Sequence, residues 1–163
     1  AAIGQADNTF TPIQLATYVS TIANNGKRYQ THIIRKITNY ERDEVIKYND
    51  PKKPVVVADA GISKANINAV KKAMRSVVTS GTATEVSRYP KKVAGKTGTA
   101  ENAGSDHVLF ICYAPYEKPE VAVAVVLEHG VKGKYAMNTA MDMLDAYFYK
   151  KTVAQIQKSG GWK

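Results

Sequence analysis

The chain has 163 residues and 44% hydrophobic side chains, enough for one core of ordinary domain size and too little for two large ones. Its formal net charge of +9, from 23 Lys and Arg against 14 Asp and Glu, raises nucleic acid or another anionic polymer as a partner. The basic residues are dispersed in pairs among acidic ones, however, and no aromatic ladder accompanies them. We therefore predict a solvated basic surface and no nucleic-acid partner, which the salt dependence of binding to unrelated DNA would test.

The apolar runs and the metal-ligating residue types predict neither a membrane span in this chain nor a metal site. The runs "HVLFICYAP" and "EVAVAVVLE" are shorter than the ~20 residues that cross a bilayer, and the N-terminus lacks the pattern of a secretory signal. Cys112 is the only cysteine, which excludes an internal disulfide, and its apolar neighbours predict a buried side chain. The three histidines are far apart in the sequence and lack ligand spacing, so we predict no metal and no cofactor.

The first predicted element is a helix with both ends marked. Thr11 is a suitable N-cap, Pro12 fits the first helical position, and Gln14 completes a capping box. Asn25 and Gly26 supply a left-handed exit from the helix. The apolar residues that recur on one face, and that we expect in the core, are Leu15, Val19 and Ile22.

A hairpin and a second helix are predicted next. Residues 31–50 contain two strand-like runs around the polar turn Glu41–Glu44, which predicts a β-hairpin. Ser63 is the predicted N-cap of the following helix, and Gly81 is its predicted end. The expected apolar stripe of this helix consists of Ile67, Val70, Met74 and Val77.

Three extended segments and a final helix complete the fold prediction. The segments Lys92–Thr99, Val108–Ala114 and Glu120–Glu128 are joined by short loops, which favours neighbouring antiparallel strands. The two later strands are apolar almost throughout, so we expect helices on both faces of the sheet. The last helix is predicted over Lys134–Lys150, with a core stripe of Met137, Met141, Leu144 and Phe148. The prediction is an α+β fold, an α/β sandwich in which helices cover an antiparallel sheet.

The predicted elements leave a short basic segment at the C-terminal end. We assign residues 1–151 to one domain. Residues 152–163 are basic and end in Gly-Gly-Trp-Lys, and we expect them to be a frayed tail or a remnant of an expression tag.

The stretch "VAGKTGTAEN" is the best candidate for a functional site. A phosphate loop would need Gly-x4-Gly-Lys-Ser/Thr before a helix, but the residue five before Gly95 is Pro90 and no helix signal follows. In an extended strand, the absent side chain of Gly98 lets a ligand lie against the backbone, and a free strand edge can pair with a peptide. Thr97 and Thr99 share one face and can both donate hydroxyl hydrogen bonds to a carboxylate.

Lys96 adds a positive charge to this stretch. Strict alternation points its side chain to the face opposite Thr97, so both can serve one site only at a sheet edge, where a long side chain can reach round. The tripeptide Lys-Thr-Gly alone is a weak signal, because it arises by chance in about one of ten shuffled sequences of this composition. Other parts of the chain must therefore support it.

Two longer blocks provide that support. They are "IGQADNTFTPIQLATYVSTIANNG" before the tripeptide and "DHVLFICYAPYEKPEVAVAVVLEHG" after it. Together with "GKTGTAE" they resemble the C-terminal half of the transpeptidase domain of class B, high-molecular-weight penicillin-binding proteins, from about Ile3 to Tyr149. The resemblance implies a partial transpeptidase fold of the penicillin-binding protein and β-lactamase type, with residues 1–151 an incomplete domain. It also implies a bacterial protein at the extracytoplasmic face of the cell membrane, anchored through sequence outside this chain.

The implied activity is serine-type D,D-transpeptidation in peptidoglycan cross-linking. In that family a serine attacks the D-Ala-D-Ala end of a stem peptide, releases D-alanine and passes the acyl group to an amine, and β-lactam antibiotics trap the same serine. Carried onto this chain, the resemblance gives Lys96 an electrostatic and proton-handling role near the nucleophile. It makes Thr97 and Thr99 the residues that bind the carboxylate of the substrate or β-lactam, and Gly98 a further substrate-binding residue. The Thr99 N–H would be half of the oxyanion hole.

Two motifs of the family are missing from the chain. No serine has a lysine three residues on, and no Ser-x-Asn occurs. Ser63 precedes Lys64, but a helix N-cap explains it better. We therefore expect the nucleophile in a missing N-terminal half of the same domain, and we expect this chain alone to be inactive.

Two further expectations follow from an incomplete domain. The chain should associate with the missing half or with itself, through apolar sheet surface left uncovered. The alternative to an enzyme is a non-catalytic β-lactam sensor or a degenerate penicillin-binding module. Ser-x-x-Lys and Ser-x-Asn motifs directly upstream would favour the enzyme.

Overall fold

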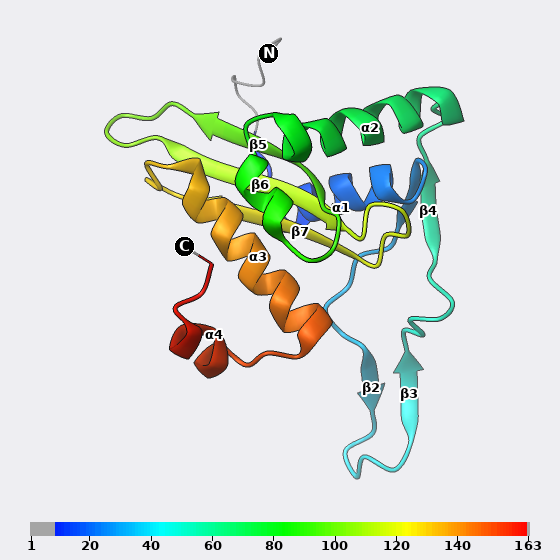
Figure 1. The fold of residues 1–163 in the computed structure, drawn as a ribbon. Coiled ribbons are helices and arrows are strands. Elements are labelled where there is room, and N and C mark those ends of the chain that lie inside the picture. The colour runs from blue at the N-terminus through cyan, green and yellow to red at the C-terminus, as the bar shows by residue number, and fades with distance from the viewer. Residues whose placement is uncertain (1–8, 163) are drawn as a thin grey trace.

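A three-stranded antiparallel sheet forms the centre of the protein, which we describe from a computed structural model over residues 9–162 (Figure 1). Its strands are β5 (Ala94–Ala100), β6 (His107–Ala114) and β7 (Val121–Leu127), in the order β5-β6-β7. The ladders are regular, with Thr99 opposite Val108 and Cys112 opposite Val123. The short loops after β5 and β6 allow this pairing of sequence neighbours, and the predicted strand order is confirmed.

Helices cover both faces of the sheet, as predicted (Figure 1). The helix α3 (Gly133–Tyr149) packs on one face, and α1 (Pro12–Ala23) packs on the other. Successive residues of β6 point to opposite faces, so its side chains divide between two cores. The core under α3 contains Val108, Phe110, Cys112, Val123, Val125, Met137, Met141 and Leu144, and the core under α1 contains Val19, Ile22, Met74, Ala94, Ile111 and Tyr113. The fold is therefore the α+β sandwich expected from the sequence.

The ends of α1 follow the predicted capping. The Thr11 hydroxyl accepts from the N–H of Gln14, and the Gln14 side chain accepts from the N–H of Thr11 at 2.8 Å. At the other end Asn25 has φ 58° and Gly26 has φ 90°. These left-handed residues turn the chain into β1 (Lys27–Tyr29).

The helix α2 (Lys64–Ser80) begins as predicted, because the Ser63 hydroxyl caps it by accepting from the N–H of Asn66. Its buried residues are Ile67, Met74 and Val78, whereas Val70 is 43% exposed. The predicted stripe is confirmed at Ile67 and Met74, and Val77 is partly buried against the core. It is wrong at Val70, because at about 100° per residue Val78 lies nearer to Ile67 and Met74 than Val70 does. A short 3-10 helix, η1 (Thr84–Arg88), leads from α2 towards β5.

Two small two-stranded sheets lie outside the central sheet. The predicted hairpin is confirmed as β2 (Lys36–Thr38) paired with β3 (Val45–Tyr48), and it projects from the body of the molecule (Figure 1). The pairing of β1 with β4 (Val56–Asp59) was not predicted, because strands of three and four residues are too short to show a pattern. None of the helices between residues 9 and 162 combines the length and hydropathy that a bilayer span needs.

The expectation of a frayed tail is wrong for the segment after Lys151. Residues Val153–Ser159 form α4, which a second capping box between Thr152 and Gln155 starts. The chain then returns to α3, where Asp142 accepts from the backbone N–H of Trp162 at 3.2 Å. The indole N–H of Trp162 donates to Asp145, also at 3.2 Å. An aromatic side chain with a buried carboxylate partner holds this segment on the domain.

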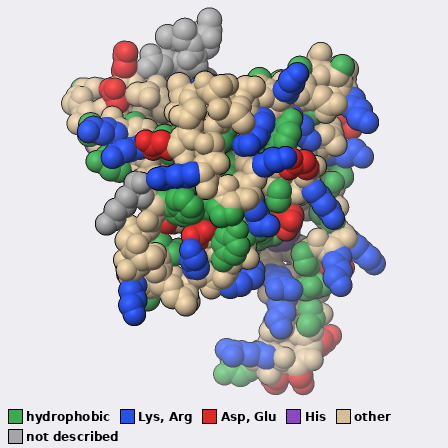
Figure 2. Space-filling view, in the orientation of Figure 1, with side chains coloured by type: hydrophobic (Ala, Val, Ile, Leu, Met, Phe, Trp, Pro, Cys, Tyr) green, Lys and Arg blue, Asp and Glu red, His purple; other side chains and the backbone are tan. Residues whose placement is uncertain are grey.

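Basic side chains are spread over the surface. Figure 2 shows Lys and Arg scattered over the visible face, between hydrophobic side chains and a few acidic ones. This distribution agrees with the solvated basic surface expected from the sequence.

Candidate functional site

The Lys-Thr-Gly stretch lies on β5, at one edge of the central sheet. The other edge of this strand has no paired strand among residues 9–162. Thr97 is opposite Phe110 and Thr99 is opposite Val108, so both threonines lie on the α3 face. The helix α3 packs mainly on β6 and β7, which leaves Thr97 half-buried and Thr99 exposed.

Lys96 lies on the opposite face but reaches round the edge. It is paired with Ile111, on the α1 face, and its Nζ donates to the carbonyl oxygen of Thr97 at 2.7 Å. Because side chains alternate along a strand, Lys96 and Thr97 can serve one site only if β5 lies at a sheet edge, and it does. The structure thus brings the Lys96 ammonium and the Thr97 backbone to the same open edge.

The same hydrogen bond indicates where the backbone donors of β5 point. Because β6 occupies the other side of the strand, we infer that the Thr97 carbonyl faces the open edge. In an antiparallel strand the N–H and C=O of one residue face the same side, and residues two apart repeat. The N–H groups of Thr97 and Thr99 are therefore directed to the open edge.

No carboxylate within residues 9–162 pairs with Lys96. Among the residues that the structure describes, ion pairs join Lys92 to Glu117 and Lys151 to Asp145, and Lys96 forms none. The exposed edge of β5 therefore combines a cation, two hydroxyls and backbone N–H groups. This set of donors is suited to an anionic ligand.

Packing against β6 explains why position 98 is a glycine, which the sequence alone does not reveal. A Cβ at Gly98 would lie 2.7 Å from Cγ of Leu109, its partner on β6. Leu109 therefore occupies the space that a side chain at this position would need. Gly95 is still more restricted, since a Cβ there would lie 2.7 Å from Cζ of Phe110 and 2.8 Å from the carbonyl oxygen of Ile111.

Sequence reasoning missed Thr82, which contacts the candidate site. Its hydroxyl lies 2.8 Å from that of Thr97, a hydrogen bond between the turn after α2 and β5. The two residues are fifteen positions apart and Thr82 is exposed, so neither periodicity nor a motif could have found the pair.

The structure brings two histidines together near the far end of β5. The backbone N–H of His129 donates to Nδ1 of His107 at 3.0 Å, and the two ring centroids are 4.9 Å apart. Over the described residues no group of three or more His, Cys, Asp or Glu could hold a metal ion. Cys112 is fully buried, and burial raises the pKa of its thiol to about 12.

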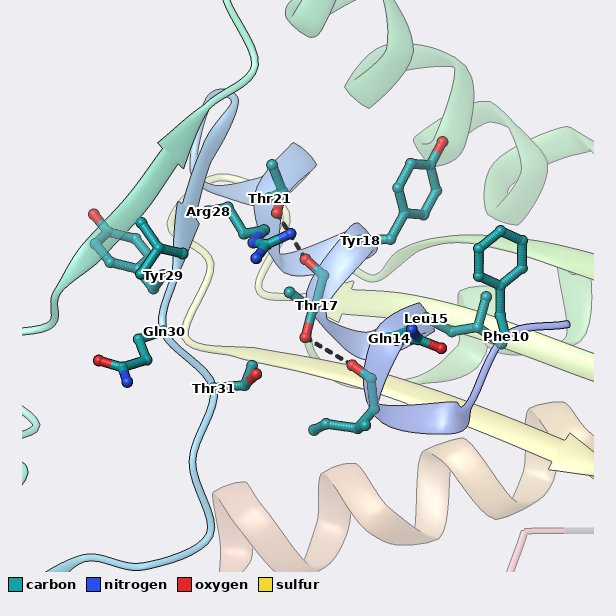
Figure 3. Close-up of a pocket in the computed structure, with 12 residues that line it drawn as sticks. Phe10, Gln14, Leu15, Thr17, Tyr18, Thr21, Arg28, Tyr29, Gln30 and Thr31 are labelled. Carbon is teal, nitrogen blue, oxygen red and sulfur yellow. Dashed lines mark hydrogen bonds between the residues drawn. The ribbon is translucent and has the colours of Figure 1, made fainter.

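A hollow of about 790 Å³ lies elsewhere, between α1 and β1 (Figure 3). Apolar residues of α1 that border it, Ile13 and Tyr18, are more than half exposed, as is Phe10 just before the helix. The central sheet does not carry the expected uncovered apolar surface, because helices cover both of its faces. Exposed apolar side chains lie instead on α1 and on the small strands β2, β3 and β4. No residue of the Lys-Thr-Gly stretch lines this hollow.

Comparison with known protein families assigns the chain to one family. A family model described as the penicillin-binding protein transpeptidase domain matches residues 1–145. The chain belongs to this transpeptidase family. It is 37% identical to penicillin-binding protein H of Bacillus subtilis over 138 residues, which cover 77% of the chain and 19% of that protein. It is 32% identical to the peptidoglycan D,D-transpeptidase MrdA of Acinetobacter baumannii, over 88% of the chain and 23% of that protein.

Solved structures agree with this assignment. Penicillin-binding protein 2B of Streptococcus pneumoniae strain R6 is similar with a TM-score of 0.76 and 28% identity, over 88% of this chain and 25% of that one. Penicillin-binding protein A of Mycobacterium tuberculosis, solved as an imipenem acyl-enzyme, is similar with a TM-score of 0.73 and 25% identity, over 87% and 32%. The resemblance to class B penicillin-binding proteins is confirmed. The chain spans about a fifth to a quarter of the curated relatives that it matches.

Proposed function

We propose that this chain is part of a serine-type D,D-transpeptidase that cross-links peptidoglycan, and that β5 supplies one wall of its active site. The observation that carries the proposal is the meeting of Lys96 Nζ, the Thr97 backbone and two threonine hydroxyls at one open strand edge. Membership in the transpeptidase family supports it, as does the activity named for the relative from Acinetobacter baumannii.

Each group at the edge has a role in acyl transfer from a D-Ala-D-Ala peptide. The hydroxyls of Thr97 and Thr99 donate to the terminal carboxylate of the peptide, or to the equivalent carboxylate of a β-lactam, with Gly98 between them. The Lys96 ammonium holds this anion electrostatically and assists proton transfer near the nucleophile. The Thr99 N–H donates to the oxyanion that forms when the serine attacks, and one such donor contributes ~3–4 kcal/mol to lowering the barrier.

The nucleophile in this proposal is a serine outside the chain. Ser63, the closest imitation of a Ser-Lys motif, uses its hydroxyl to cap α2. We propose that the upstream part of the same domain supplies Ser-x-x-Lys and Ser-x-Asn, and that it packs on the exposed apolar side of α1 near Ile13 and Tyr18. The complete protein then acts at the extracytoplasmic face of the bacterial membrane, where its substrate is found.

Replacement of Lys96 in the full-length protein tests this proposal. We expect Lys96→Ala to lower the rate of acylation by a fluorescent penicillin by more than about tenfold, because it removes an ammonium that forms no ion pair within residues 9–162. The matched control is Lys118→Ala, an exposed lysine in the β6–β7 loop. Equal acylation rates in the two variants would place the site elsewhere.

A further inference from the structure

The hydroxyl of Thr82 lies 2.8 Å from the Thr97 hydroxyl, although Thr82 is outside the Lys-Thr-Gly stretch. It belongs to the turn between α2 and η1. Within residues 9–162 no other hydrogen bond joins the Thr97 or Thr99 side chain to another part of the chain.

The backbone around Thr82 is held on both sides. A Cβ at Gly81 would lie 2.8 Å from Cα of Val77, so the chain turns here more tightly than a larger residue would allow. The N–H of Ala83 donates to the carbonyl of Val77 at 3.0 Å, and the Ala83 side chain is fully buried. Thr82 thus extends its hydroxyl from a fixed turn and not from a loose loop.

The hydroxyl protons of Thr82 and Thr97 determine which of the two residues donates the hydrogen bond when a carboxylate is bound. Each threonine hydroxyl has one proton and can also accept. A carboxylate only accepts, so when it binds at β5 the proton of Thr97 must point to the carboxylate. The Thr97 oxygen is then left as the acceptor, and Thr82 is the donor.

We propose that Thr82 is a positioning residue for the carboxylate site. By donating to Oγ1 of Thr97, it fixes the rotamer of Thr97 and directs the Thr97 proton towards the ligand. Hydrogen bonds in such a chain polarise and strengthen one another. The inference rests on the proposed function, because it assumes that Thr97 binds the carboxylate.

The test compares a carboxylate ligand with its neutral ester in the full-length protein. The readout is the second-order rate of acylation by benzylpenicillin and by its methyl ester. We expect Thr82→Val to slow the acid about three- to tenfold, the value of one neutral hydrogen bond, and to leave the ester rate within about twofold. Thr82→Ser keeps the hydroxyl and should retain the rate with the acid. The double variant with Thr97→Val should lose no more than Thr97→Val alone.

The outcomes separate this proposal from the one on which it rests. Equal slowing of acid and ester by Thr82→Val would mean a merely structural role and would overturn the inference. If Thr97→Val discriminates acid from ester and Thr82→Val does not, Thr82 has no positioning role, while the carboxylate site stands. If neither variant discriminates, the carboxylate assignment itself fails. Should Thr82→Val not fold, Thr82→Ala is compared with Thr82→Ser by the same ratio of rates.

Discussion

Replacing Gly95 by alanine should destabilise the protein more than the same change at Gly98. At Gly95 the new Cβ would meet the Ile111 carbonyl oxygen at 2.8 Å and the Phe110 ring at 2.7 Å. The first is backbone of the paired strand and the second is fully buried, so neither can move without spreading the sheet. Overpacking of this kind costs ~1–3 kcal/mol, and we place Gly95→Ala near about 2 kcal/mol.

At Gly98 the obstacle is one leucine side chain and not backbone. The new Cβ would meet Cγ of Leu109 at 2.7 Å, but Leu109 is only half-buried and can turn away. We expect a cost below about 1 kcal/mol, because alanine also restricts the unfolded chain and so recovers ~0.4–1 kcal/mol. Gly133 is the control, since nothing lies within 4 Å of a Cβ there, and Gly133→Ala should not destabilise.

Thermal unfolding of the 163-residue chain at a fixed concentration measures these differences. At ~2–4 °C per kcal/mol for a chain of this size, Gly95→Ala should lower Tm by about 4–8 °C. Gly98→Ala should lower it by less than half of that, and Gly133→Ala should leave it unchanged or raised. Equal losses at Gly95 and Gly98 would refute the argument that a rigid backbone neighbour decides the cost.

Three other variants test separate parts of the structure. Thr99→Val in the full-length protein should slow penicillin acylation by at least about tenfold, because a hydrogen bond to a charged group is lost while the backbone donor stays; an unchanged rate would remove Thr99 from the carboxylate site. The Cys112 thiol should resist alkylation at pH 8 until the protein unfolds, and because its pKa is raised to about 12, stability should fall as pH rises above the unfolded value of ~8.5, a slope that Cys112→Ala would reduce. Trp162→Ala should cost about 1–3 kcal/mol in thermal unfolding, less than the ~3–5 kcal/mol of a fully buried tryptophan because Trp162 is only partly buried. The exposed control Lys158→Ala should cost less, whereas a frayed tail would show no difference between the two variants.

Local signals in the sequence predicted most of the fold. The capping box of Thr11 and Gln14 located α1, and the apolar runs around Cys112 located the strands that helices cover on both faces. These features depend on residues within one turn or one strand. The Thr152 and Gln155 pair is the same signal and marks the start of α4, whereas the basic composition around it favours a tail.

Contacts between distant segments could not be predicted. The bond between Thr82 and Thr97, the pairing of β1 with β4 and the return of Trp162 to α3 all depend on how elements pack. For the site, alternation placed Lys96 and Thr97 on opposite faces, and only the edge position of β5 explains how one lysine reaches the Thr97 carbonyl.

The most direct test of the split active site is labelling of the 163-residue chain itself with a fluorescent penicillin, read by intact mass. We expect no covalent adduct, because no serine in the chain has a lysine three residues on, as the Ser-x-x-Lys motif requires. Addition of the upstream segment in trans should restore labelling, on a serine that is not in this chain. A stable adduct on any of the chain's own serines would contradict the account.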